Sequence, residues 1–69
     1  MSKEFDFFIF LLEMYADHKG VMPGEILKIL KEKQLMDTVV SGYEMYHQEA
    51  LQNAFDDLDS LIATGKPAF

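Results

Sequence analysis

Apolar residues recur along this chain at the three- and four-residue spacing of amphipathic helices. The first run predicts a helix from about Lys3 to His18. It should end at Gly20, because glycine readily takes the left-handed conformation that follows a helix end. Asp6, Glu13 and Asp17 share one narrow polar edge, so more than half of the circumference of this helix is apolar.

The apolar residues of this first helix form two stripes. The first stripe holds Phe5, Phe8, Ile9, Leu12 and Ala16, and the second holds Phe7, Phe10 and Met14. Apolarity on all sides is typical of a central helix packed between other helices. Alternatively, the second stripe meets a partner protein or a second copy of the chain, because monomers rarely expose large contiguous apolar patches. The pattern leaves both interpretations open.

Two further helices follow. Pro23 suits the first turn of a helix over residues 23–33, where its missing N–H costs nothing. Asp37 is the expected N-cap of a third helix that runs to about His47. The apolar positions of these two helices are Ile26, Leu27, Ile29 and Leu30, then Met36, Val39, Val40, Tyr43 and Tyr46.

A fourth helix is predicted from about Glu49 to Thr64, ended by Gly65 and Pro67. Its apolar stripe consists of Leu51, Ala54, Phe55, Leu58, Leu61 and Ile62. Asp56, Asp57 and Ser60 are expected on the opposite, solvated face.

The fold class that these patterns predict is all-α, because no segment shows the alternation of a strand. Short connections place neighbouring helices against each other. We therefore expect residues 1–69 to form a single helical domain, a compact bundle of three to four short helices. Its ordered core should cover about residues 3–64, with a C-terminal tail at 65–69.

Composition narrows the cellular setting. The chain has 69 residues and no Cys, which suits a reducing cytoplasm and excludes disulfides and thiolate metal sites. The apolar run from Phe7 to Leu12 is too short to span a membrane, and the acids Glu4 and Asp6 before it are unlike a signal peptide. We expect a cytoplasmic protein with no membrane association.

The net charge of −6 argues against nucleic-acid binding, because neutralisation of phosphates supplies most of that affinity. Residues 1–34 carry six acids and five Lys (−1), whereas residues 35–69 carry six acids and one Lys (−5). An acidic half of this kind suits a basic partner or solubility alone. A DNA-associated regulator would need basic surface that the sequence does not supply.

Candidate chemistry is sparse. Glu44 and His47 have the Glu-x-x-His spacing of di-iron bundles, but those sites need two such motifs, and only one copy is present. His47 is instead expected to pack on its helix and to hydrogen-bond a free carbonyl at the helix end. The acids of the segment 56–59 lack the pattern of a calcium loop and are interpreted as a solvated face or as a contact for a Lys/Arg-rich partner. We expect no catalytic residues, cofactor or metal, and hence no enzyme.

Four segments carry a resemblance to a known family. They are Phe8-Ile9-Phe10-Leu11-Leu12-Glu13-Met14-Tyr15, Gly24-Glu25-Ile26-Leu27, Tyr43-Glu44-Met45-Tyr46-His47 and Asp57-Leu58-Asp59. Their order and spacing, over residues 5–62, resemble short bacterial proteins of the domain of unknown function number three-seven-nine-one. The chain departs from that pattern at Tyr46, where Leu is usual, and at Met22-Pro23, where a Ser-type cap is usual. Such proteins are often encoded beside toxin-like genes, so the resemblance implies an accessory or antitoxin-like role.

The leading functional hypothesis is a non-catalytic protein-interaction module, with an antitoxin-like partner of a larger bacterial protein as its most specific form. The candidate contact residues are Phe7, Phe10 and Met14, or Tyr43, Tyr46 and His47. The alternatives are a homo-oligomeric structural protein, a DNA-associated regulatory protein and an acidic mimic of nucleic acid.

Overall fold

Five helices build the fold in the computed structural model, which describes residues 2–68. They are α1 (Lys3–Lys19), α2 (Pro23–Glu32), α3 (Met36–Ser41), α4 (Tyr43–Tyr46) and α5 (Leu51–Thr64). No strand occurs within residues 2–68, and the all-α prediction is confirmed. Met1 and Phe69, the ends of the predicted domain, lie outside the described residues.

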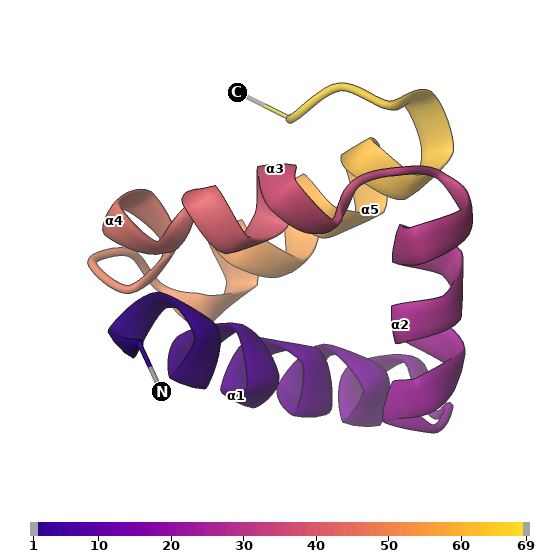
Figure 1. The fold of residues 1–69 in the computed structure, drawn as a ribbon, viewed down its shortest axis with the longest axis horizontal. Helices are drawn as coiled ribbons and strands as arrows, with labels where there is room; N and C mark the ends of the chain where they lie inside the picture. The colour runs from indigo at the N-terminus through magenta and orange to yellow at the C-terminus, as the bar shows by residue number, and fades with distance from the viewer. Residues whose placement is uncertain (1, 69) are drawn as a thin grey trace.

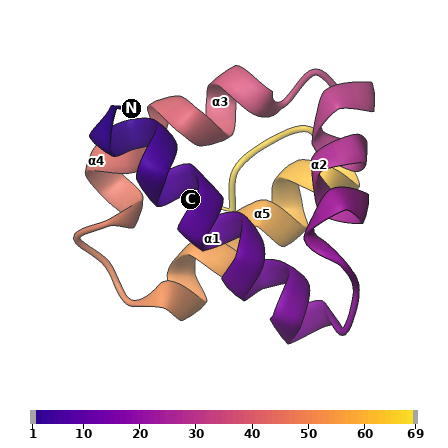
Figure 2. The same cartoon turned by 60° about the horizontal axis from the view of Figure 1, so that its bottom comes forward.

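The other helices pack against one side of α1, which runs along one edge of the molecule (Figure 1). In that view α2 stands across the end of α1, α3 returns along the opposite side, and α4 brings the chain back to the beginning of α1. Figure 2 shows α1 crossing in front of α5. Helix α1 contacts α2, α3 and α4, and α4 contacts α5. None of the helices in residues 2–68 combines the length and apolarity needed to cross a membrane.

The ends of α1 are closed by local hydrogen bonds. The hydroxyl of Ser2 accepts a hydrogen bond from the backbone N–H of Phe5 at 3.1 Å. At the other end Gly20 has the expected left-handed φ of 73°, and the next N–H, of Val21, bonds to the carbonyl of Ala16 at 3.0 Å. Gly65 ends α5 with a φ of 79°. Both predicted glycine stops are therefore confirmed.

The single third helix predicted from Asp37 to His47 is wrong, because the chain breaks into α3 and α4 at Gly42. The N–H of Gly42 bonds to the carbonyl of Val39, three residues back instead of four, which tightens the turn there. Asp37 is not the N-cap either. That position belongs to Leu35, and Asp37 lies inside the first turn of α3.

The hydrophobic core lies between α1 and α5 and is closed by α2, α3 and α4. Its buried side chains are Phe8, Leu11, Leu12, Tyr15, Ala16, Ile26, Leu30, Leu35, Val39, Tyr46, Ala54, Phe55, Leu58 and Leu61. The first predicted stripe of α1 is therefore only partly buried. Leu11 and Tyr15, which were assigned to neither stripe, are in the core, whereas Phe5 and Ile9 are exposed.

Gly42 provides a test of this packing. A Cβ atom at residue 42 would meet the ring of Tyr46, whereas a Cβ at Gly24 meets nothing within 4 Å. We expect Gly42→Ala to lower the free energy of unfolding by about 1–3 kcal/mol, because the buried ring must shift. Gly24→Ala, the matched control, should be neutral or slightly stabilising. Urea unfolding followed by circular dichroism would measure both, and equal stabilities of the two variants would contradict this account.

Candidate functional site

An aromatic patch joins the first helix to the fourth. We define it as Phe7 and Phe10 of α1 together with Tyr43 and His47 at the two ends of the α4 turn. The ring of Phe7 is central: its centroid lies 6.0 Å from that of Phe10, 5.6 Å from that of Tyr43 and 6.4 Å from that of His47. Phe7 and Phe10 of the first candidate region and Tyr43 and His47 of the second are therefore neighbours in space.

The α4 turn fixes two of these rings against each other. Tyr43 and His47 are four residues apart, so their side chains project from the same face of the turn. Their rings are parallel within 4°, with centroids 4.2 Å apart. Nδ1 of His47 lies 2.6 Å from the carbonyl oxygen of Tyr43, which also accepts the backbone N–H of His47 at 3.0 Å and so is not the free carbonyl expected from the sequence. His47 is nevertheless exposed, so its ring is part of the surface of the protein.

The patch divides into anchored and exposed side chains. Phe7 is half-buried and packs against the core, which holds the other rings in place. Phe10 remains 49% exposed, and Met14, one turn further along α1, remains 37% exposed. Tyr46 is only 3% exposed and belongs to the core. The sequence had grouped Tyr46 with Tyr43 and His47, but its side chain lies on the inner side of α4 and provides no contact surface.

A second apolar edge of α1 was not singled out as surface from the sequence. Phe5 and Ile9, one turn apart, are exposed beside the buried Phe8. The sequence could have predicted this exposure, because Phe5 and Ile9 lie at the border of the first α1 stripe. The few other helices pack on the middle of that stripe and leave its border uncovered. The aromatic patch and this edge lie on opposite sides of the acids of α1.

Asp57 does not lie on a solvated face, contrary to the sequence prediction. Its side chain is 1% exposed and accepts hydrogen bonds from the hydroxyl of Tyr46 and, at 2.7 Å, from the backbone N–H of Ala68. A buried carboxylate needs such donors, because its desolvation is costly. The segment after α5 therefore folds back over the helix, and the same hydrogen bonds anchor α4 to α5.

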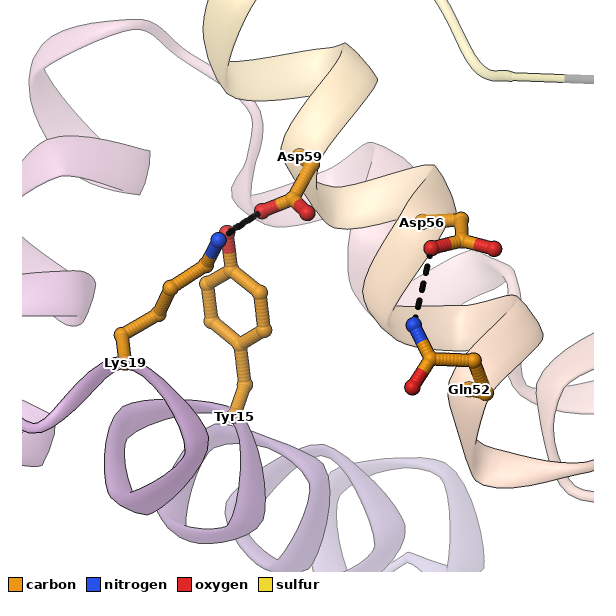
Figure 3. A network of polar contacts seen from close by, with 5 residues as sticks. All are labelled: Tyr15, Lys19, Gln52, Asp56 and Asp59. Atoms are coloured by element: carbon orange, nitrogen blue, oxygen red, sulfur yellow. Dashed lines mark hydrogen bonds and ion pairs between the residues drawn. The ribbon is translucent and has the colours of Figure 1, made fainter.

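Asp59 forms a second, more open network with α1 (Figure 3). One oxygen accepts a hydrogen bond from the Tyr15 hydroxyl at 2.5 Å and lies 2.8 Å from Nζ of Lys19. Burial alone would raise the pKa of Asp59, but hydrogen bonds from Lys19 and Tyr15 and the positive charge of Lys19 lower the pKa below its ordinary value. Asp56, by contrast, is exposed and bonds along its own helix to Gln52 (Figure 3).

These two networks are built to hold helices together. Each aspartate accepts a hydrogen bond from a tyrosine of another helix. Burial is the larger cause, and the neighbouring carboxylate the smaller one, that raises the pKa of both Tyr15 and Tyr46 above 10. The sequence contained an indication of these contacts. A buried tyrosine hydroxyl needs a hydrogen-bond partner, and the aspartates of α5 are candidate acceptors. Within residues 2–68 no group of three or more His, Asp or Glu gathers in the manner of a metal site.

A shallow depression of about 340 Å³ lies where the end of α2 meets the end of α5. Lys33 is the ionisable side chain among its lining residues, and the others are apolar residues, Thr64 and Gly65. This arrangement brings together no acid–base pair or nucleophile. The aromatic patch is therefore the best candidate for a functional site.

Comparison with known proteins identifies a family. The family described as "Protein of unknown function (DUF3791)" matches residues 6–64. No curated protein matches the chain. No solved structure matches it either. The resemblance carried by the four sequence segments is thus confirmed as to the family.

Removing the hydroxyl of each tyrosine should separate the two networks. In Tyr46→Phe the buried Asp57 retains only the N–H of Ala68, so we expect a loss of about 1–3 kcal/mol in the free energy of unfolding. Tyr15→Phe leaves Asp59 with Lys19 and with solvent, so the loss should be about 1 kcal/mol or less. Chemical denaturation at neutral pH measures both, and a loss at Tyr15 that exceeds the loss at Tyr46 would refute this ranking.

Alkaline pH should weaken the fold. Below pH 10.0, the ordinary pKa of tyrosine, Tyr15 is protonated in both folded and unfolded chains and contributes no pH dependence. Above pH 10.0 Tyr15 loses its hydroxyl proton in the unfolded chain but retains it in the folded chain, so the free energy of unfolding falls as pH rises. We expect this decline to be steeper in the wild type than in Tyr15→Phe, measured as urea midpoints from about pH 9 to 11. Parallel declines would show that Tyr15 is not responsible.

Proposed function

This chain belongs to the DUF3791 family of proteins of unknown function, and from its surface we propose that it is a non-catalytic module that binds another protein. The contact surface is the aromatic patch extended by Met14. We further propose that it acts in the cytoplasm, since a chain without Cys suits a reducing compartment.

The observation that carries this proposal is the exposure of Phe10. A phenylalanine on a central helix would add to the core if it pointed inward, yet half of this ring faces solvent beside Phe7, the ring that also contacts Tyr43 and His47. Aromatic residues and Met are enriched in protein–protein interfaces, and binding energy concentrates on a few such side chains. Phe7, Tyr43 and His47 are already packed against each other, so a partner would meet ordered rings and little side-chain entropy would be lost on binding.

Charge favours a protein over nucleic acid as the partner. The net charge is −6, and Asp6 and Glu44 are exposed on the two helices that build the aromatic patch. Phosphates would be repelled from such a surface. A DNA-associated role has no comparable support, and we do not propose it.

The more specific form of this proposal is an antitoxin-like partner of a larger bacterial protein. It is motivated by the family resemblance, in which short chains of this kind accompany toxin-like genes. An exposed aromatic patch on a small helical bundle suits such a role, because masking a toxin requires a binding surface and no chemistry. Co-expression that suppresses the toxicity of a genetic neighbour would support this form.

Substitution of Phe10 tests the proposal. We expect Phe10→Ser to keep the fold, because the side chain is half-exposed, and to lose a partner that the wild type co-purifies from its source cells. If Phe10 is a hot spot of the interface, its loss should weaken binding by about 2 kcal/mol or more, roughly thirtyfold. The matched control is Met22→Ser, since Met22 is 70% exposed in the turn between α1 and α2, away from the aromatic patch.

Retention of the same partner by Phe10→Ser would refute the assignment of this surface. Sedimentation of the wild type over a range of concentrations addresses the homo-oligomeric alternative. Self-association that Phe10→Ser abolishes would show that a second copy occupies the aromatic patch, in place of a different protein.

A further inference from the structure

We propose that the partner presents a basic amphipathic helix, which lies along the outward face of α1 with its apolar side on Phe10 and Met14 and its Lys or Arg side chains against Asp6, Glu13 and Asp17. This inference rests on the proposed function and adds the chemistry of the partner to it.

The outward face of α1 places one apolar side chain, Phe10, in a row with three acids. Asp6, Phe10, Glu13 and Asp17 follow each other at spacings of four, three and four residues, so they form one row along the helix. All four are exposed. The core-facing residues of the same helix, such as Phe8, Leu12 and Tyr15, are buried, so this row lies on the side of α1 away from the core. The surface therefore offers the apolar ring of Phe10 between the carboxylate of Asp6 on one side and those of Glu13 and Asp17 on the other.

Within the described residues 2–68, the carboxylates of this row form no ion pair. The ion pair that the structure shows among residues 2–68 joins Lys19 to Asp59 of α5, and it involves no residue of this row. Lys3 begins the same outward face, so one ammonium group stands against the three carboxylates of Asp6, Glu13 and Asp17. Cationic side chains of a partner would supply the missing charges and, as arginine, could also stack on the exposed aromatic rings.

The geometry suits a helix as the occupant. From Asp6 to Asp17 the row extends about 16 Å along α1, which corresponds to about three turns of a partner helix. Phe10 and Met14 are one turn apart, the spacing at which ridges of one helix pack into grooves of another. A second copy of this chain fits less well, because each copy would bring the same three carboxylates and one ammonium group to the interface.

Designed peptides test this inference directly. The probes are three helical peptides of about 18 residues, long enough to cover the row: one of Leu and Lys with an amphipathic pattern, one with Glu in place of Lys, and one with Ser in place of Leu. We expect the Leu/Lys peptide to bind about tenfold or more tightly than either of the others, because several exposed charge pairs add to apolar contact. Binding is measured by fluorescence anisotropy at low and high salt, and high salt should weaken it.

Two matched variants identify the face. Charge reversal of the row, Asp6→Lys with Glu13→Lys and Asp17→Lys, should abolish the preference for the Leu/Lys peptide. The control reverses three exposed acids elsewhere, Glu25→Lys, Glu32→Lys and Asp37→Lys, with the same change in net charge, and should retain most of it. Equal effects of the two variants would mean that only net charge matters, and would overturn the inference.

The outcomes for this inference and for the proposed function can be told apart. Equal binding of the Leu/Lys and Leu/Glu peptides, both lost in Phe10→Ser, would refute a basic partner and leave the aromatic patch as a binding surface. Failure of all three peptides to bind would also refute the basic helix. If Phe10→Ser additionally kept the cellular partner, the proposed function would fail with it.

Discussion

The fold depends on how much of α1 the rest of a short chain can cover. Helix α1 has apolar residues on most of its circumference, and the four other helices pack against one side of it. Leu11, Tyr15 and Ala16 are consequently sealed in the core, whereas Phe10 and Met14 stay at the surface. Within residues 2–68 the opposite side of α1, which carries Phe10, Glu13 and Asp17, stays exposed.

Two tyrosine–aspartate contacts make up for the shortness of the elements that pack on α1. Helix α4 has only four residues, too few to be stable alone, and is held by the hydrogen bond from Tyr46 to Asp57. Helix α5 is held to α1 by Asp59, which accepts a hydrogen bond from Tyr15 and forms an ion pair with Lys19. The buried α4 anchor also positions Tyr43 and His47, so the aromatic patch relies on a polar contact on the inner side of the same turn.

Much of this fold follows from local rules that the sequence displays. Gly20 and Gly65 end helices where their backbone freedom is needed, and Pro23 opens α2. The break at Gly42 could not be read in this way, because it depends on the ring of Tyr46 occupying the space beside residue 42. The burial of Asp57 was hidden for a similar reason: its donors, Tyr46 and Ala68, are each eleven residues away and meet it only after folding. The periodicity of α1 identified Phe10 and Met14, but their union with Tyr43 and His47 required the tertiary structure.

The hydrogen bond from Ala68 to Asp57 limits which sequence changes the C-terminal segment tolerates. Its donor is a backbone N–H, which every residue type except proline provides. The contact is therefore indifferent to the identity of the side chain at position 68 but sensitive to the number of residues between the end of α5 and that position. Insertions or deletions in the segment 65–67 would move the donor away from the carboxylate, whereas most point substitutions at 68 would leave it in place. Chain length in this segment is thus under a structural constraint that a comparison of residue types alone would miss.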